Sequence, residues 1–356
     1  MRRCFWPLMV FLCGCFGPTG DNNLRLVLQL KDPHWVGTGC ADGVADVIRQ
    51  RLDYYGVSGS NISITTEANR IVVFVEGLVD PDRAERLITT SGSIGFWETY
   101  ENAEVYPYLS SVNKLLANLE EAERQANGME KEELEPERPK LLEKFGSDTS
   151  SGDAEMEMAF RDMEMNNPLF AKLSPAGSTQ GLFAGPVIGY AAARDTAKIN
   201  AYFAMEEVKA LLPGNLKLAW TNKPIDMKDT SAVHQLIAIK VLGNGQLPAL
   251  DGSSITDADP YVGTDNKQPE VSMQMDDEGA RSWQLLTRNN VGRSIAITVN
   301  EYVYSFPTVQ GEIMGGRSSI TGNFTQEEAQ DLANVLSSKA HPCGVVVLEK
   351  QVSQRE

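Results

Sequence analysis

Residues 43–76, GVADVIRQRLDYYGVSGSNISITTEANRIVVFVE, decide the fold, because their hydrophobic pattern changes from helical spacing to strand alternation within one stretch. In residues 43–56 the apolar side chains recur on one face of a helix, and Gly56 stands where helices commonly end. Residues 62–65 and 70–76 alternate apolar and polar side chains, as strands with one buried face do. The stretch therefore predicts a helix followed by a β-hairpin.

The flanking segments extend this pattern to six elements. Residues 24–30 (LRLVLQL) predict a strand before the helix. Asp80 and Pro81 predict the start of a second helix, because aspartate caps free amides and proline is tolerated at the first helical position. Residues 93–100 (SIGFWETY) predict a closing strand. The order strand, helix, strand, strand, helix, strand is that of a ferredoxin-like βαββαβ unit.

The same order returns near the C-terminus. Its predicted elements are strand 271–275, helix 277–290, strands 294–299 and 302–306, a helix that opens with the capping box Thr325 to Glu328, and strand 345–348. We therefore predict an α+β fold in which two ferredoxin-like βαββαβ halves, residues 24–100 and 271–350, form a base. Residues 101–270 are predicted to be inserted between them as an α/β head.

Within the head, residues 115–145 are rich in charge and predict a solvated helical hairpin. A helix is expected over 196–212 and a strand over 236–241. Residues 247–268 are rich in Gly, Asp and Pro, which predicts a linker back to the second half of the base.

Composition and motifs narrow the function classes. The chain has 32 basic and 48 acidic residues, a formal net charge of −16, which disfavours binding to nucleic acid. His34, His234 and His341 do not have metal-ligand spacing, and no nucleophile motif is present. Residues 315–319 (GGRSS) lack the lysine and the directly following helix of a phosphate loop. We expect no enzyme activity, cofactor or metal.

The N-terminus predicts an export signal. Two arginines precede a short apolar run over residues 5–12, and Leu12-Cys13-Gly14-Cys15 is similar to a bacterial lipobox. Residues 1–15 are therefore predicted to be a signal peptide of the lipoprotein type, with Cys15 as the lipidated residue. The alternatives are a plain signal peptide and the remnant of a first transmembrane helix.

If cleavage occurs before Cys15, two further cysteines remain, Cys40 and Cys343. In an oxidising compartment they could form a disulfide, provided that the two ends of the chain pack together. The alternative is two unpaired thiols.

Several motifs resemble the first periplasmic domain of the bacterial protein-export subunit SecD, or of its SecDF fusion of the Bacteroidetes type. They are residues 47–57 (VIRQRLDYYGV), 70–77, 95–102 (GFWETYEN), 277–281, 290–293, 303–307, 315–325 (GGRSSITGNFT) and 328–336. The motif residues expected to shape a turn are Gly315, Gly316, Arg317, Gly322, Asn323 and Phe324.

This resemblance implies a base with a moving head that holds unfolded preprotein on the outer face of the inner membrane. The implied hinges are residues 102–109 and 268–270. The implied partners are the Sec translocon, or a separate SecDF membrane part, and the preprotein, with the membrane reached through a lipid anchor. The expected location is the periplasm.

Two departures from the family limit that expectation. The family's Gly-Leu-Asp-Leu-x-Gly-Gly segment is not recognisable around residues 24–31, and the chain stops at Glu356, where the family enters its membrane bundle. We therefore expect an accessory export factor without a proton-conducting part of its own. The alternatives are a lipid-anchored binding or scaffold protein that has lost export function, and a truncated SecDF fragment.

Overall fold

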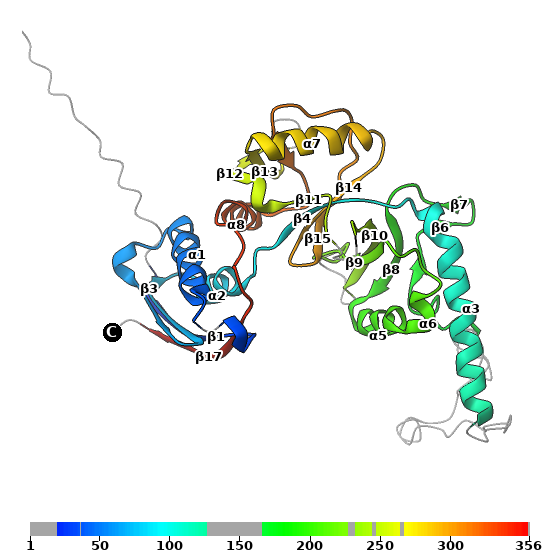
Figure 1. The fold of residues 1–356 in the computed structure, drawn as a ribbon, viewed down its shortest axis with the longest axis horizontal. Coiled ribbons are helices and arrows are strands. Elements are labelled where there is room, and N and C mark those ends of the chain that lie inside the picture. The colour runs from blue at the N-terminus through cyan, green and yellow to red at the C-terminus, as the bar shows by residue number, and fades with distance from the viewer. Residues whose placement is uncertain are drawn as a thin grey trace, which may run out of the picture. The chain divides into compact units, whose positions relative to one another are not determined.

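The computed structural model describes residues 20–354 except residue 36 and segments 127–165, 227–231, 244–246 and 264–266. The chain forms two compact units (Figure 1). Unit 1 comprises residues 1–93, 252–276 and 318–356, and unit 2 comprises residues 94–251 and 277–317. Both units combine helices with antiparallel sheets, so the predicted α+β class is confirmed.

Unit 1 is assembled from both ends of the chain. Its main elements are β1 (Asn22–Leu30), α1 (Cys40–Tyr55), β2 (Ile62–Glu67), β3 (Arg70–Leu78), α2 (Pro81–Thr89), β12 (Ile255–Val262), β13 (Pro269–Met275), β16 (Arg317–Ile320), α8 (Gln326–Ser337) and β17 (Val345–Gln354). Short 3-10 turns are η1 (Pro33–Trp35), η2 (Gly59–Asn61) and η4 (Gly252–Ser254).

The larger sheet of unit 1 has the order β17-β1-β3-β2 and is antiparallel throughout. Helices α1 and α2 cover one face of it (Figure 1). Alternate residues of β1 and β3 meet the apolar stripe of α1, and they form a core that includes Leu24, Leu26, Ile48, Leu52 and Val73. The burial follows from the period of two along each strand and the helical spacing along α1.

Residues 93–100 contain a strand, as predicted, but the prediction that it closes the sheet of this unit was wrong. Its strand, β4 (Ile94–Glu98), lies in unit 2 and pairs with a strand there. The position beside β1 is taken by β17, which pairs with it from Asn22↔Gln354 to Leu30↔Val345. Sequence order alone could not choose between two apolar strands that both follow α2.

The predicted second βαββαβ half does not form a single sheet. Strand β13 lies in a three-stranded sheet of order β12-β13-β16, whereas the two strands expected to join it lie in unit 2. Helix α8 packs on β12 and β13. Strand β12 falls in residues 247–268, which we predicted to be a linker. Only Ile255 and Ala258 of this strand are buried, so its pattern was too sparse to read as a strand.

Unit 2 has two four-stranded sheets. Its elements are β4, α3 (Asn102–Ala126), β5 (Ser174–Pro175), β6 (Gly177–Ser178), β7 (Gly181–Leu182), β8 (Val187–Ala192), α5 (Ala193–Ala204), α6 (Glu206–Lys209), β9 (Leu216–Trp220), β10 (Val233–Lys240), β11 (Leu250–Asp251), α7 (Asp277–Asn289), β14 (Ile295–Val299) and β15 (Tyr302–Ser305). The sheet orders are β5-β8-β10-β9 and β11-β4-β14-β15.

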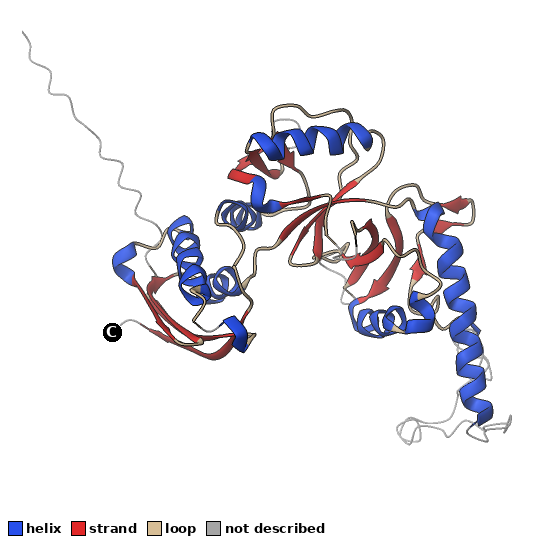
Figure 2. Cartoon of the chain, viewed as in Figure 1, coloured by secondary structure: helices blue, strands red, loops and turns tan. Residues whose placement is uncertain are grey.

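The long helix α3 contributes to the core of unit 2 (Figure 2). Val105, Leu109, Val112 and Leu116 recur at helical spacing and are buried with residues of α5, β8 and β10. Residues 102–109, predicted to be a hinge connection, are therefore the first turns of a helix that buries Asn102, Val105 and Leu109. The charged segment predicted for 115–145 is helical up to Ala126, and the rest of it lies outside the described residues.

The local signals of the sequence are confirmed. Gly56 ends α1 with a positive φ of 95°, which glycine adopts without the steric cost of a side chain. The Asp80 side chain accepts a hydrogen bond from the backbone N–H of Arg83 at 2.9 Å and caps α2. Thr325 and Glu328 form the reciprocal capping box of α8.

Candidate functional site

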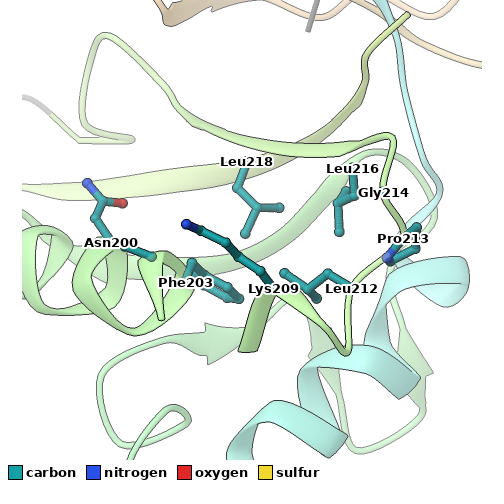
Figure 3. A pocket seen from close by; sticks show the side chains of 9 residues that line it. Asn200, Phe203, Lys209, Leu212, Pro213, Gly214, Leu216 and Leu218 are labelled. Atoms are coloured by element: carbon teal, nitrogen blue, oxygen red, sulfur yellow. The ribbon is translucent and has the colours of Figure 1, made fainter. Parts of the chain in front are cut away.

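A cavity of about 420 Å³ opens on unit 2 (Figure 3). Its lining residues are Asn200, Phe203, Ala204, Lys209, Leu212, Pro213, Gly214, Leu216 and Leu218. They come from the end of α5, from α6, from the loop after it and from β9. Lys209 is the one titratable residue among these nine. Most of the other lining residues are apolar, so the cavity can take an apolar side chain next to polar lining atoms such as those of Lys209.

The local sequence explains why this cavity forms. Helix α5 ends at Ala204, and the chain passes through α6 and Pro213-Gly214 before entering β9. Leu216 and Leu218 are two residues apart, so both side chains leave β9 on the same face. Figure 3 shows both projecting into the cavity opposite Phe203.

One hydrogen bond and one exposed ion pair involve residues that line the cavity. The indole Nε1 of Trp220 donates to Oδ1 of Asn200 at 2.9 Å, which ties β9 to α5. The Lys209 ammonium lies 2.7 Å from a carboxylate oxygen of Glu206. Because both partners of that ion pair are exposed, it contributes little stability and leaves the lysine free to rearrange.

Strand β9 lies at the edge of its sheet. It pairs with β10 from Leu216↔Lys240 to Trp220↔Leu236. On its other side, the end of β9 approaches β15: Thr221 forms an isolated bridge with Val303, whose carbonyl accepts a hydrogen bond from Asn222 N–H at 2.9 Å. The Lys217 ammonium lies 3.6 Å from the Glu301 carboxylate. An edge strand presents backbone N–H and C=O groups that can pair with an additional extended chain. Because Leu216 and Leu218 line the cavity, strand β9 contributes both to the cavity and to the edge of the sheet.

The predicted turn residues do not line the cavity. Gly315 and Gly316 have positive φ values of 79° and 69°, and they turn the chain into β16. Arg317 and Asn323 are exposed. Gly322 is needed because a Cβ there would lie 2.7 Å from the ring of Phe324, which is 9% exposed. These residues shape backbone and pack an aromatic ring.

The cysteines and histidines are dispersed. The sulfur atoms of Cys40 and Cys343 lie at bonding distance, with their Cα atoms 6.2 Å apart. Cys15 and the predicted signal peptide lie outside the described residues. His34 contacts Asp32, and the Nδ1 of His234 lies 2.9 Å from the carbonyl oxygen of Thr221. In the described part of the chain, no three His, Cys, Asp or Glu side chains are grouped to hold a metal.

Sequence reasoning missed a buried cation in unit 1, Arg51, whose side chain is fully buried. Its Nε donates to Oγ of Ser338 and its Nη1 to the carbonyl of Leu87, both at 3.0 Å. Other partners of the guanidinium are the carbonyls of Thr90, Ser91 and Lys339, and Nε2 of His341 at 3.1 Å. The available signal was an arginine on the apolar face of α1, beside Ile48 and Leu52.

Burial sets the protonation of this pair. It lowers the pKa of Arg51 to about 10, so the guanidinium remains charged at neutral pH. Burial and, secondarily, the adjacent Arg51 charge lower the pKa of His341 to about 3. His341 is therefore neutral and can accept the hydrogen bond from Arg51.

Two models of known protein families match segments of this chain. The family model "SecDF, P1 head subdomain" matches residues 239–343, and "Protein translocase subunit SecDF, P1 domain, N-terminal" matches residues 41–101. Residues 102–238, which contain the cavity, lie between the two matched segments. The head predicted for 101–270 overlaps the matched head only over 239–270, so the predicted domain boundaries stay a prediction.

Two relatives support the same assignment. The protein translocase subunit SecD of Rhodothermus marinus is 33% identical over 312 residues, which cover 86% of this chain and 45% of that protein. The SecD of Sebaldella termitidis is 39% identical over 127 residues, 35% of this chain and 30% of that protein. The chain also matches a solved structure of SecDF, described as a membrane component that enhances protein export. The match covers 91% of this chain and 98% of that chain at 19% identity, with a TM-score of 0.45.

Both family models describe P1, a domain of protein translocase subunits. The chain belongs to the SecD/SecDF family. The segments that the family models match are parts of its P1 domain. It spans less than half the length of the R. marinus relative. Among the described residues, no helix combines the length and the apolar character needed to cross a membrane.

Proposed function

We propose that this chain acts in Sec-dependent protein export, where it binds and holds unfolded preprotein on the outer face of the inner membrane. Membership in the family supports the export role. The observation that carries the holding role is the cavity of unit 2, which Phe203, Leu216 and Leu218 help to line beside the edge strand β9.

The geometry suits an extended chain of unspecified sequence. Backbone groups of such a chain can pair with the edge of β9, and this pairing is independent of side-chain identity. One apolar side chain can then enter between Phe203, Leu216 and Leu218. Burying a Leu or Phe side chain is worth about 1.5–3 kcal/mol. A site of this kind binds weakly and releases readily, which a holding step between movements requires.

The proposed partners are the Sec translocon, or a separate SecDF membrane part, together with the preprotein. We also propose that residues 1–15 are a lipoprotein signal and that Cys15 carries the lipid, which would keep the protein at the membrane in the periplasm. Acyl labelling that persists in the Cys15→Ala variant would contradict the lipid anchor. Cys40 and Cys343 are proposed to form a disulfide in that compartment.

Site-directed photo-crosslinking to a stalled secretory chain tests the holding role. The crosslinker replaces Lys209 of α6, whose side chain lines the cavity and is half exposed. Tyr202 of α5 is unsuitable because it is only 7% exposed. We expect a crosslink to the stalled chain from Lys209, and its reduction in the Leu218→Ser variant. A crosslinker at Arg49, an exposed residue of unit 1, serves as the control.

If the stalled chain never crosslinks at Lys209 while the protein is folded, the holding role is wrong. Capture of a folded periplasmic protein instead would favour the second candidate function, a lipid-anchored binding or scaffold protein.

A further inference from the structure

Helix α1 contacts one segment of the C-terminal region along most of its length. Residues 337–343 follow α8 and lead into β17. Near the C-terminal end of α1, the Gln50 side chain donates to the Ser337 carbonyl at 3.4 Å, and Arg51 binds Ser338 and Lys339. The helix and the segment both belong to unit 1, although about 290 residues separate them in sequence.

The contact continues toward the N-terminal end of α1. A Cβ at Gly43 would lie 3.0 Å from the ring of Pro342, so the absence of a side chain there lets the proline approach the helix. Cys40, the first residue of α1, then meets Cys343. The segment therefore runs antiparallel to α1 and is held at three successive points, of which the cysteine pair is the last.

Arg51 is the strongest of these points before any covalent bond exists. Its guanidinium donates to backbone carbonyls and neutral side chains of two segments, 87–91 and 338–341, rather than to a carboxylate. A buried charge without such partners would cost several kcal/mol, so the unit is stable only when both segments are in place. The N–H of His341 also donates to the Ser91 carbonyl at 2.7 Å and joins the two segments directly.

The absence of a side chain at Gly92 leaves space for the Arg51 guanidinium. Gly92 has a φ of +73°, and a Cβ at this position would lie 2.3 Å from Nη2 of Arg51. Asn334 of α8 donates from Nδ2 to the backbone carbonyl of Arg51 at 2.8 Å, which aligns the start of the segment with the same turn of α1.

We propose that Arg51 is a positioning residue for the disulfide: it docks residues 338–341 onto α1 and thereby brings Cys343 to Cys40 before the two thiols are oxidised. The oxidant is a small disulfide such as oxidised glutathione. One cysteine thiolate attacks it and releases one reduced thiol, and the second cysteine thiolate attacks the mixed disulfide and releases the other. Two protein thiols become one disulfide, the oxidant becomes two thiols, and the two protons pass to the released thiolates.

The test measures the effective concentration of the Cys40–Cys343 pair in the full chain equilibrated with reduced and oxidised glutathione, with Cys4, Cys13 and Cys15 replaced by Ser. We expect Arg51→Met to lower this effective concentration at least tenfold. Arg49→Met is the matched control, because Arg49 lies on the same helix but is exposed and bonded only to Asp46. It should stay within twofold of the unchanged chain. An equally small effect of Arg51→Met would overturn the proposal.

A second measurement separates docking from general unfolding. In a chain that also carries Cys40→Ser and Cys343→Ser, amide hydrogen exchange is followed at His341 and, for comparison, across β14 of unit 2. With Arg51 present, the His341 amide should be protected although no disulfide can form. In Arg51→Lys and Arg51→Met its protection should fall progressively, while β14 keeps its protection. Loss of protection at His341 in the thiol-free chain with Arg51 intact would show that the disulfide docks the segment, and the proposal would be wrong.

Discussion

Acidification should weaken unit 1 through one residue, His341. This imidazole is 8% exposed, and the charged group that faces it is the guanidinium of Arg51, 3.1 Å away. Burial and that charge lower its pKa from 6.5 to about 3. In the unfolded chain it titrates with the ordinary value of about 6.5. Below that pH the unfolded state binds a proton that the folded state does not bind, so stability falls as the pH falls.

The magnitude follows from the same two values. Above about pH 6.5 the imidazole is neutral in both states and does not lower the free energy of unfolding. Between the two pKa values, that free energy falls by about 1.4 kcal/mol for each pH unit of acidification. Between pH 7 and pH 5, the loss is about 2 kcal/mol. It is enough to change the fraction of opened unit 1 by more than tenfold.

Amide hydrogen exchange across α1 measures the free energy of opening of unit 1 without requiring the two units to unfold together. His341→Gln keeps an acceptor near Arg51 and removes the titration, so it should flatten the decline between pH 7 and pH 5. His34→Gln is the control, because the His34 side chain is 92% exposed. The reasoning is refuted if the unchanged chain and His341→Gln show the same pH dependence.

Three further substitutions have defined outcomes. Phe96→Ala removes a fully buried ring that contacts Trp283 edge-on at 5.1 Å, and it should lower the stability of unit 2 by about 3–5 kcal/mol in urea unfolding followed by tryptophan fluorescence. Thr325→Ala removes the α8 cap and should cost about 1 kcal/mol, whereas Thr325→Ser should be nearly neutral. Gly92→Ala should lower the protection of α1 amides for two reasons. A side chain at the positive φ of this position costs about 1–2 kcal/mol, and the added Cβ would displace the Arg51 guanidinium. A Gly92→Ala chain with unchanged exchange would contradict this role of the glycine.

The sequence predicted the elements whose causes are local. Gly56, Asp80 and the Thr325 capping box each act within about one helical turn, so their residues suffice to place a helix boundary. The β14–β15 hairpin followed in the same way, because Asn300 and Glu301 adopt the positive φ values of a tight turn.

Features that depend on distant partners were missed. Both β4 and β17 are apolar strands after α2, and nothing within either segment states which of them pairs with β1. Arg51 was visible as a family motif residue, but the carbonyls that receive it come from segments 36 to 288 residues away. The cavity beside β9 likewise combines residues of two helices, a loop and a strand, and none of them alone predicts it.

The pairing of β1 with β17 has a consequence for how the protein is made. The register joins Asn22 to Gln354, so the sheet of unit 1 is completed only when two strands about 330 residues apart in sequence meet. A pairing over so long a separation forms slowly, because the loop between the strands must first be closed. Until β17 arrives, the open edge of β1 can join other strands, so newly made chains should depend on chaperones.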